Sequence, residues 1–375
     1  MGRKRFTGGC DFWQRTALTG CSLLLYNSYN NDKYDAEKGG SNMAKIDLVT
    51  GFLGSGKTTF IKKYVRYLLD KGERVGIIEN DYGAISVDLM LLDEELGQDC
   101  GLEMVVAGDM DCYRRRFKTK LISMGMLGYD RVIVEPSGIF DVDEFFDILY
   151  EEPLDRWYQM GNVIAIVDEA LEENMSEESE YLLVSQIADA GTILLSKVTE
   201  NGEQAQERTV AHMNRALEKF TCDRRYVFPG SDILAKPWGH LTGGDFEKIE
   251  NCGYVAASHS KRHVSEENEY QSLFFYHVVM AESELLEMKK ELFEDASYGR
   301  VYRVKGFVKT PKEDWLQLNA TAAETDLKVV EQGQEVLIVI GEALEDEKIC
   351  SLVTGLSHEK DITTGQTAHG CHHNN

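Results

Sequence analysis

The chain has 375 residues, of which 43% are hydrophobic, and a formal net charge of −24 at pH 7. This length is enough for about two domains, each with its own hydrophobic core. The acidic balance argues against a nucleic-acid-binding surface, which requires clustered lysine and arginine, and the sequence holds no apolar run approaching the ~18 residues of a membrane span.

The first 42 residues differ in character from the rest of the chain. Basic residues at 3–5 precede a Leu-Thr-Gly-Cys sequence at 18–21, as in a lipoprotein signal. However, Asp11 and Arg15 interrupt the apolar segment that such a signal requires. We therefore expect residues 1–42 to be a disordered extension or the product of an upstream mis-start, with the folded chain beginning near Met43.

A glycine-rich segment at residues 51–58, GFLGSGKT, comes after an apolar run at 46–49 and opens onto a helix-like stretch. Its spacing, G-x-x-x-x-G-K-[ST], is that of a phosphate-binding loop, in which glycines let backbone N–H groups point at phosphate oxygens. In such a loop Lys57 reaches the β- and γ-phosphates and the Thr58 hydroxyl binds Mg²⁺. We therefore predict a nucleotide site here, with a catalytic role for Lys57.

Apolar strand-like runs alternate with helical patterns after this loop. The strands are expected at 74–79, 104–107, 131–135, 163–168, 192–196 and 225–228, and the helices at 59–70, 113–126, 141–150, 178–190 and 203–219. Continuous apolar strands that alternate with helices indicate a parallel sheet covered on both faces. The fold class predicted for residues 43–235 is therefore α/β, a doubly wound, mostly parallel-sheet P-loop NTPase domain.

The remaining chain divides into three further parts. Residues 236–269 contain proline, glycines and a charged polar run, which favour a linker. Residues 270–358 show several strand patterns and two helical ones, which predict a small α+β domain with a mostly antiparallel sheet. The tail at 359–375 carries His369, Cys371, His372 and His373, which either bind a transition metal or are functionally silent.

Acidic residues end two of the predicted strands. Glu135 ends the run VIVE, where a P-loop NTPase needs a carboxylate near Mg²⁺, and we predict it as the second catalytic residue. Glu79 and Asp81 lie at the end of another strand, on the edge where doubly wound sheets bind ligands. Taken alone, the latter pair is equally typical of a solvated turn.

Ser196 and Lys197 end a late strand, where base-contacting residues usually lie in such proteins, so that Lys197 could pack over the base. The predicted nucleotide-binding residues are Gly51, Gly54, Ser55, Gly56, Lys57, Thr58, Thr59, Ser196 and Lys197.

Taken together, these segments resemble the CobW-like P-loop GTPases of the CobW/HypB/UreG group, which handle metal ions. The matching text is LVTGFLGSGKTTFIKKYV, GIIENDYGAISVD, VIVEPSGIFD, VIAIVDEA, SQIADAGTILLSK and GRVYRVKGFV, in the expected order over roughly residues 45–355. The resemblance implies GTP and Mg²⁺ binding, slow hydrolysis, a ferredoxin-like carboxy-terminal domain at 270–358 and an unknown client metalloprotein. Carried over by position, the predicted metal-binding residues are Thr58, Glu79 and Asp81, together with Asp109, Asp111 and Cys112, which align with the family's metal motif.

The chain departs from this family at its metal motif. Relatives have Gly-Cys-x-Cys-Cys, whereas residues 108–112 read Gly-Asp-Met-Asp-Cys, and the acid expected at position 84 is Ala84. Thiolates select soft or borderline ions such as Zn²⁺, and carboxylates favour harder ones. This leaves two interpretations: metal transfer through this motif is lost, or its selectivity has moved toward oxygen-preferring metals.

The second departure concerns the base. Relatives read guanine with [NT]-K-x-D, and this chain has Thr199 at the aspartate position. A threonine cannot accept the paired hydrogen bonds of the guanine edge, each worth about 1.5–3 kcal/mol to a charged acceptor. Guanine preference should therefore fall by about ten- to a thousandfold unless Glu200 substitutes, and ATP stays an alternative to GTP.

The sequence thus supports two hypotheses. The first is a cytoplasmic, Mg²⁺-dependent GTPase with a metallochaperone role. The second is a nucleotide-gated protein-binding module, in which hydrolysis and metal transfer are vestigial. Both hypotheses predict a nucleotide as a partner, and neither predicts a nucleic acid or a membrane. The sequence is compatible with a homo-oligomer.

Overall fold

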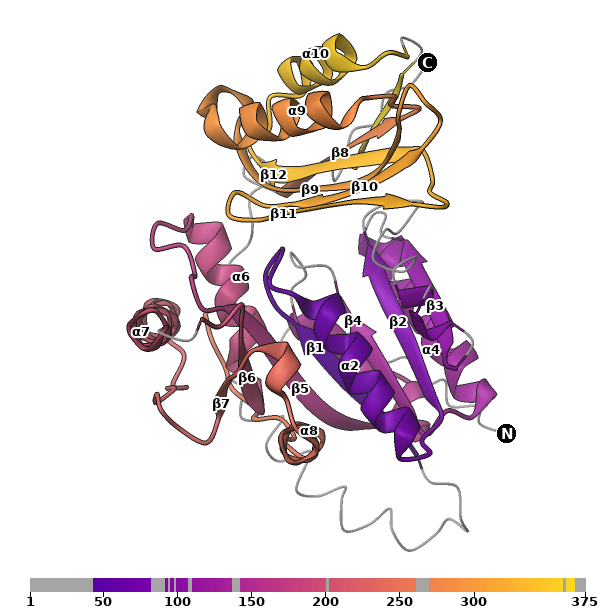
Figure 1. Cartoon of the computed structure of the whole chain (residues 1–375). Helices are drawn as coiled ribbons and strands as arrows, with labels where there is room; N and C mark the ends of the chain where they lie inside the picture. Colours follow the sequence, from indigo (N-terminus) through magenta and orange to yellow (C-terminus); the bar gives the residue numbers. More distant parts are fainter. Residues whose placement is uncertain are drawn as a thin grey trace, which may run out of the picture. The chain divides into compact units, whose positions relative to one another are not determined.

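The computed structural model describes residues 43–81, 92–93, 95–97, 99–106, 110–136, 142–199, 202–260, 270–359 and 362–367 (Figure 1). The expected extension at 1–42 lies outside these residues. In the described part of the chain, no helix combines the length and the apolar character that a membrane crossing requires.

The first described region contains a sheet of seven parallel strands in the order β3-β2-β4-β1-β5-β6-β7 (Figure 1). The strands are β1 (Ala44–Thr50), β2 (Val75–Asp81), β3 (Gly101–Val106), β4 (Arg131–Glu135), β5 (Tyr158–Asp168), β6 (Thr192–Ser196) and β7 (Ile233–Ala235). Their carboxyl ends lie at one edge of the sheet because all run in the same direction. The predicted doubly wound α/β class is confirmed.

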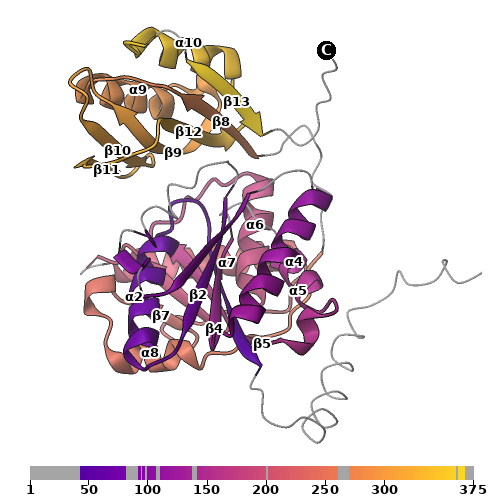
Figure 2. The same cartoon turned by 90° about the vertical axis from the view of Figure 1, so that its right-hand side faces the viewer.

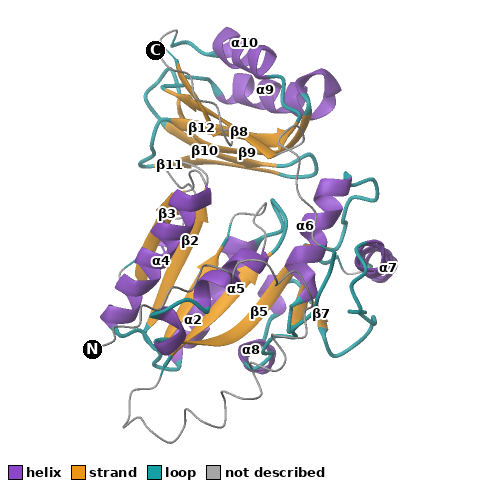
Figure 3. Cartoon of the chain, turned by 180° about the vertical axis from the view of Figure 1, so that it is seen from behind, coloured by secondary structure: helices purple, strands orange, loops and turns teal. Residues whose placement is uncertain are grey.

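Helices cover both faces of this sheet (Figure 3). They are α2 (Lys57–Asp70), α4 (Met110–Leu127), α5 (Val142–Leu149), α6 (Glu177–Ala188), α7 (Glu203–Lys219) and α8 (Gly243–Glu250), with short 3₁₀ turns η1 (Leu154–Arg156) and η2 (Trp238–His240). Consecutive residues of β1 pack into cores on opposite faces of the sheet. Leu48 packs with α4 to α7, whereas Val49 packs with α2 and α8. Burial on both faces explains the continuous apolar strands.

One predicted strand is wrong. Residues 225–228 are irregular, because the amide side chain of Asn214 occupies both backbone groups of Tyr226. Its Oδ1 accepts from the Tyr226 N–H at 2.9 Å, and its Nδ2 donates to the Tyr226 carbonyl at 2.8 Å. The edge strand is β7 instead.

The interval 236–269, expected as a linker, contains α8. This helix begins with a capping box, in which the Thr242 hydroxyl accepts from the backbone of Asp245 and the Asp245 carboxylate accepts from the backbone of Thr242. Its apolar residues Phe246 and Ile249 pack in the same core as α2. Two glycines in the first turn lower the helix propensity and hid this helix from sequence-based prediction.

The second region is an antiparallel sheet in the order β11-β10-β9-β12-β8-β13 (Figure 2). It comprises β8 (Tyr270–Tyr276), α9 (Glu282–Glu294), η4 (Ala296–Tyr298), β9 (Arg300–Lys309), β10 (Trp315–Ala320), β11 (Thr325–Val330), β12 (Val336–Glu342), α10 (Asp346–Leu356) and β13 (Thr363–Thr367). The succession β8-α9-β9-β12-α10-β13, with β12 paired to both β9 and β8, is a ferredoxin-like arrangement. The hairpin β10–β11 extends it beyond β9. The expected ferredoxin-like α+β region is therefore present, and β13 was not predicted.

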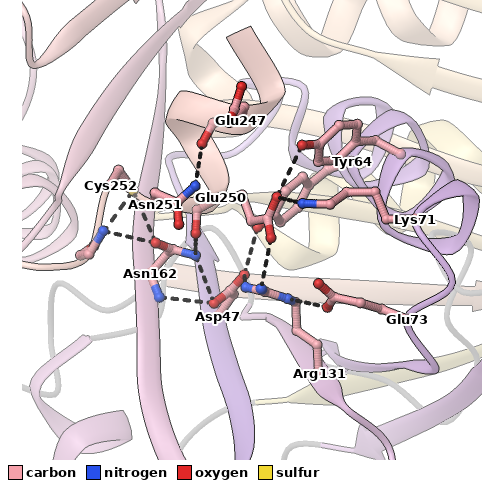
Figure 4. A network of polar contacts seen from close by, with 12 residues as sticks. Asp47, Tyr64, Lys71, Glu73, Arg131, Asn162, Glu247, Glu250, Asn251 and Cys252 are labelled. Atoms are coloured by element: carbon pink, nitrogen blue, oxygen red, sulfur yellow. Dashed lines mark hydrogen bonds and ion pairs between the residues drawn. The ribbon is translucent and has the colours of Figure 1, made fainter. Parts of the chain in front are cut away.

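A buried polar network joins the middle of β1 and β5 to the start of β4 in the first sheet (Figure 4). Asp47 and Arg131 are both fully buried, and an Arg131 guanidinium nitrogen donates to Asp47 Oδ2 at 2.7 Å. The same oxygen accepts from the Tyr64 hydroxyl at 2.8 Å, and Oδ1 accepts from the backbone and side chain of Asn162 at 2.9 and 3.0 Å. Glu73 adds a second carboxylate to Arg131 at 2.8 Å.

This network predicts a large stability effect at Asp47. Asp47→Ala should lower the free energy of unfolding by roughly 3–5 kcal/mol, because it leaves the buried Arg131 guanidinium without its main counter-charge. Urea denaturation followed by circular dichroism measures the difference. The control is Asp130→Ala, which removes an ion pair to Arg74 whose side chains are 66% and 49% exposed and should leave stability nearly unchanged. Equal losses in the two variants would contradict the assignment.

Candidate functional site

The loop between β1 and α2 has the backbone geometry of a phosphate cradle. Gly51, Gly54 and Gly56 have φ angles of 148°, 73° and 94°, which side-chain-bearing residues rarely adopt. A Cβ on Gly51 would lie 2.2 Å from the Ile166 carbonyl oxygen, so this position accepts glycine alone. The loop leads directly into the amino terminus of α2, where unpaired N–H groups and the helix dipole favour an anion.

The loop lysine lies across the cradle that it helps to form. Lys57 is 7% exposed, and its Nζ donates to the Gly51 carbonyl at 2.9 Å and contacts the Phe52 carbonyl at 3.5 Å. These contacts hold a positive charge directly beside the backbone that would bind phosphate. This is the position that the motif requires of Lys57.

The hydroxyl at the start of α2 meets the acid at the end of β4. Thr58 Oγ1 donates to Glu135 Oε1 at 2.8 Å. Glu79 is the register partner of Glu135 on the adjacent strand β2, and both carboxylates are buried. A hydroxyl and two carboxylates form an oxygen-rich donor set next to the phosphate cradle, which fits Mg²⁺.

The other predicted metal ligands are only partly described. Asp81 ends β2, while Asp111 and Cys112 lie in the first turn of α4. Their side chains and the whole of Asp109 lie outside the described residues, as do Ala84 and the tail from 368 onward. Among the described side chains, no three His, Cys, Asp or Glu residues gather closely enough to hold a metal ion. The transition-metal site therefore stays a prediction.

The predicted base-contacting lysine is held between two carboxylates. Lys197 comes directly after the buried Ser196 and adopts a left-handed backbone with a φ of 55°. Its Nζ lies 2.9 Å from Asp168 Oδ2 and 3.0 Å from Glu324 Oε2. Burial lowers the pKa of Lys197, but its hydrogen bonds and the charges of the two acids outweigh this and raise the pKa overall. The ammonium group is therefore charged and fixed in place.

Sequence reasoning missed Glu169, which holds the loop after Lys197. The buried Glu169 Oε1 accepts from the backbone N–H of Thr199 at 2.8 Å, and Oε2 accepts from Gln206 at 3.0 Å. The Thr209 hydroxyl also donates to the Glu169 carbonyl at 2.6 Å. The side chain of Thr199 itself is exposed. An acid directly after a buried strand was the available signal, but its partners lie 30 or more residues away.

A cavity of about 850 Å³ extends from the phosphate cradle. Its lining includes the loop residues 54–59, Glu135, Lys197 and Trp238, and, from the antiparallel sheet, Arg303 and Asn319. The indole nitrogen of Trp238 comes within 3.4 Å of where a Cβ on Gly56 would stand, so this ring forms a wall beside the loop. A space of this size is typical of small-molecule and cofactor sites. Trp238 and Arg303 were not predicted as site residues.

A parallel α/β sheet whose first strand leads through this glycine loop into a helix, with a threonine and a strand-end acid beside it, defines a P-loop nucleotide-binding protein. The family model of the CobW/HypB/UreG nucleotide-binding domain matches residues 45–227. The chain therefore carries a CobW/HypB/UreG-family nucleotide-binding domain over these residues, and the family resemblance predicted from the motifs is confirmed.

Individual relatives cover parts of the chain. It is 30% identical to the zinc chaperone YjiA of Escherichia coli (strain K12) over 193 residues, which are 48% of this chain and 58% of YjiA. It is 29% identical to the zinc chaperone YeiR of the same organism over 173 residues, which are 44% of this chain and 51% of YeiR. The chain thus spans about half the length of these curated relatives. A crystal structure of Zn(II)-bound YjiA GTPase from E. coli aligns over 84% of this chain and 99% of that chain, with a TM-score of 0.32 and 19% identity.

Proposed function

We propose that this protein is a Mg²⁺-dependent nucleoside-triphosphate hydrolase that uses GTP and handles a metal ion for a client protein. The hydrogen bond between Thr58 and Glu135 is the observation that carries the proposal, because it brings together the hydroxyl and carboxylate that a nucleotide-bound Mg²⁺ requires. The family resemblance supports GTP as the nucleotide, and the names of the curated relatives support a role in handling metal.

The proposed reaction is phosphoryl transfer to water. Water adds to the γ-phosphorus while the bond to the β–γ bridging oxygen breaks, which yields nucleoside diphosphate, inorganic phosphate and one proton. Lys57 and the backbone of residues 51–58 would hold the phosphates in place, and Thr58, Glu135 and Glu79 would hold Mg²⁺. When bound, Mg²⁺ supplies positive charge to the phosphate oxygens. Most of the rate enhancement in such sites comes from positioning and electrostatics.

The metal ion would be cargo rather than a resident cofactor. Asp109, Asp111 and Cys112 occupy the segment where relatives carry cysteines, and two carboxylates in this set would favour an oxygen-preferring ion over Zn²⁺. The client protein would be a metalloprotein.

The nucleotide-gated binding module is favoured by one specific contact. Phe52, inside the phosphate-binding loop, packs edge to face on Tyr270 and Tyr302 of the antiparallel sheet, with ring centroids 6.0 and 5.6 Å apart. Any shift of the loop on nucleotide binding would therefore reach these strands directly. In this second candidate function, the nucleotide sets the state of residues 270–358 toward a protein partner without metal transfer.

Thr58→Ala tests the proposed hydrolase. The variant should need at least about tenfold more Mg²⁺ for half-maximal phosphate release, because it loses one ligand of the cation. Phosphate release from GTP over a Mg²⁺ titration measures this. Thr119→Ala is the matched control, since that hydroxyl donates to the Arg115 carbonyl on the exposed side of α4. An unchanged Mg²⁺ requirement in Thr58→Ala would refute the assigned cation site.

Thr199→Asp tests the interpretation of relaxed base choice. A carboxylate at this position should raise the preference for GTP over ATP by about ten- to a thousandfold, because it restores a charged acceptor for the guanine edge. Competition binding of the two nucleotides measures the ratio, and Thr199→Val, which has a similar shape without a carboxylate, should bring no gain. A preference of the unmodified protein for GTP above about a hundredfold would contradict relaxed base choice.

Elemental analysis tests the metal cargo. Purified protein and Asp111→Ala are compared with and without GTP and Mg²⁺, and we expect less bound metal in the variant because a carboxylate ligand is lost. Asp130→Ala removes a carboxylate from an exposed ion pair elsewhere and should retain the metal. Identical metal content of wild type and Asp111→Ala in both conditions would exclude the segment at 109–112 as a metal site and favour the binding module.

A further inference from the structure

Strand β9 contains an irregularity that changes where its side chains point. On the neighbouring strand, Ile340 pairs with Arg303 and Gly341 pairs with Val301, so that Tyr302 is an extra residue in β9. This is a β-bulge, which lets two consecutive residues leave the regular alternation and is often found beside functional sites. The core-facing valines, Val301 and Val304, are accordingly three positions apart rather than two.

Because of the bulge, two neighbouring residues of β9 lie away from that core and close to the phosphate-binding loop. The Tyr302 ring lies 5.6 Å from the ring of Phe52, which belongs to the loop. Arg303 lines the same cavity as residues 54–59 of the loop. The end of β10 comes equally near, because a Cβ on Gly54 would stand 2.7 Å from the methyl group of Thr321.

The Arg303 side chain is buried and oriented. It is 9% exposed, and its Nε donates to Asn319 Oδ1 on β10 at 3.0 Å. Asn319 also lines the cavity, so the hydrogen bond fixes the guanidinium at the cavity wall. A planar, permanently charged guanidinium suits phosphate oxygens, which it can bind through two parallel N–H bonds. A positive charge fixed at this wall favours an anionic ligand in the cavity.

We propose that Arg303 is a catalytic residue that contacts the terminal phosphate of the bound nucleotide. The antiparallel sheet thus supplies a residue to the nucleotide site of the parallel sheet. The inference rests on the proposed function and deepens it. Arg303 stabilises the negative charge that the γ-phosphoryl oxygens carry while this group is transferred to water. The stabilising arginine then comes from the same chain as the phosphate-binding loop. Hydrolysis then depends on the antiparallel sheet staying beside the loop, so a client that displaces this sheet slows hydrolysis.

The test compares Arg303→Ala with Arg303→Lys and the control Arg300→Ala. Arg300 lies on the same strand and contacts the first region through Glu172 and the Asn174 carbonyl at 2.5 and 2.6 Å, outside the phosphate cavity. Each purified full-length variant is first checked by circular dichroism. Single-turnover hydrolysis of GTP is then measured, together with the affinities for GDP and for a slowly hydrolysed GTP analogue.

Arg303→Ala should lower the hydrolysis rate by on the order of 10³-fold. It should weaken binding of the analogue more than binding of GDP, and free guanidinium should restore part of the hydrolysis rate. Arg303→Lys should keep the charge but recover only a part of the rate, and Arg300→Ala should hydrolyse like the unmodified protein. A structural role alone would move GDP and analogue affinity equally and give no guanidinium rescue.

A rate for Arg303→Ala within about threefold of wild type, or an equal loss in Arg300→Ala, would overturn the proposal. If the unmodified protein binds nucleotide without hydrolysing it, the proposed function fails. The analogue-to-GDP comparison still decides the phosphate contact of Arg303 in that case.

Discussion

The parallel sheet depends on a fully buried ion pair between Asp47 of β1 and Arg131 of β4. Neither charge would be tolerated alone in this interior, so the two strands and the groups that complete the pair must assemble together. Tyr64 ties α2 to the pair, and Asn162 ties β5 to it. The pair thereby fixes these strands at positions away from their carboxyl ends. Their carboxyl ends are left to carry Gly51, Glu79 and Glu135.

Separating a structural end from a chemical end explains why the site residues can be small and acidic. Glycines with positive φ and buried carboxylates destabilise a fold locally, and such costs concentrate where function requires them. Gly51 approaches the Ile166 carbonyl so closely that any side chain would force the loop away from β5.

The sequence was most informative for strands that are buried on both faces of the sheet. The strands of the parallel sheet are buried on both faces and appear as continuous apolar runs, so β1, β4 and β6 were located to within two residues. The loop at 51–58 was also found, because its spacing reflects its own backbone geometry. In contrast, α8 was missed because its glycines contradict local helix propensity, and only its packing beside α2 outweighs them.

The candidate site could be predicted only as far as it is local in sequence. Glu169 lies in the family-like segment VIAIVDEA, but its role arises from the fold that brings Thr199 and Gln206 to its carboxylate. Arg303 lies in a family-like segment, but the sequence assigns it no role, because its direction depends on the bulge at Tyr302. Tertiary structure decides both, and period-two strand patterns do not reveal where a strand breaks its alternation.

The contacts of the loop bear on which parts of the family's chemistry this chain has kept. Phe52 and Leu53 lie inside the phosphate-binding motif, and both pack on the antiparallel sheet. Glu324, from the hairpin of that sheet, forms an ion pair with Lys197 in the same cavity. The two sheets are therefore in contact through the residues that would bind nucleotide, whereas the proposed metal segment carries Asp109 and Asp111 in place of the cysteines that the family resemblance leads us to expect. A change in cargo leaves this contact intact, because no thiolate takes part in it. Contact between the phosphate-binding loop and the antiparallel sheet is thus the feature on which the binding-module candidate and the proposed role of Arg303 both depend.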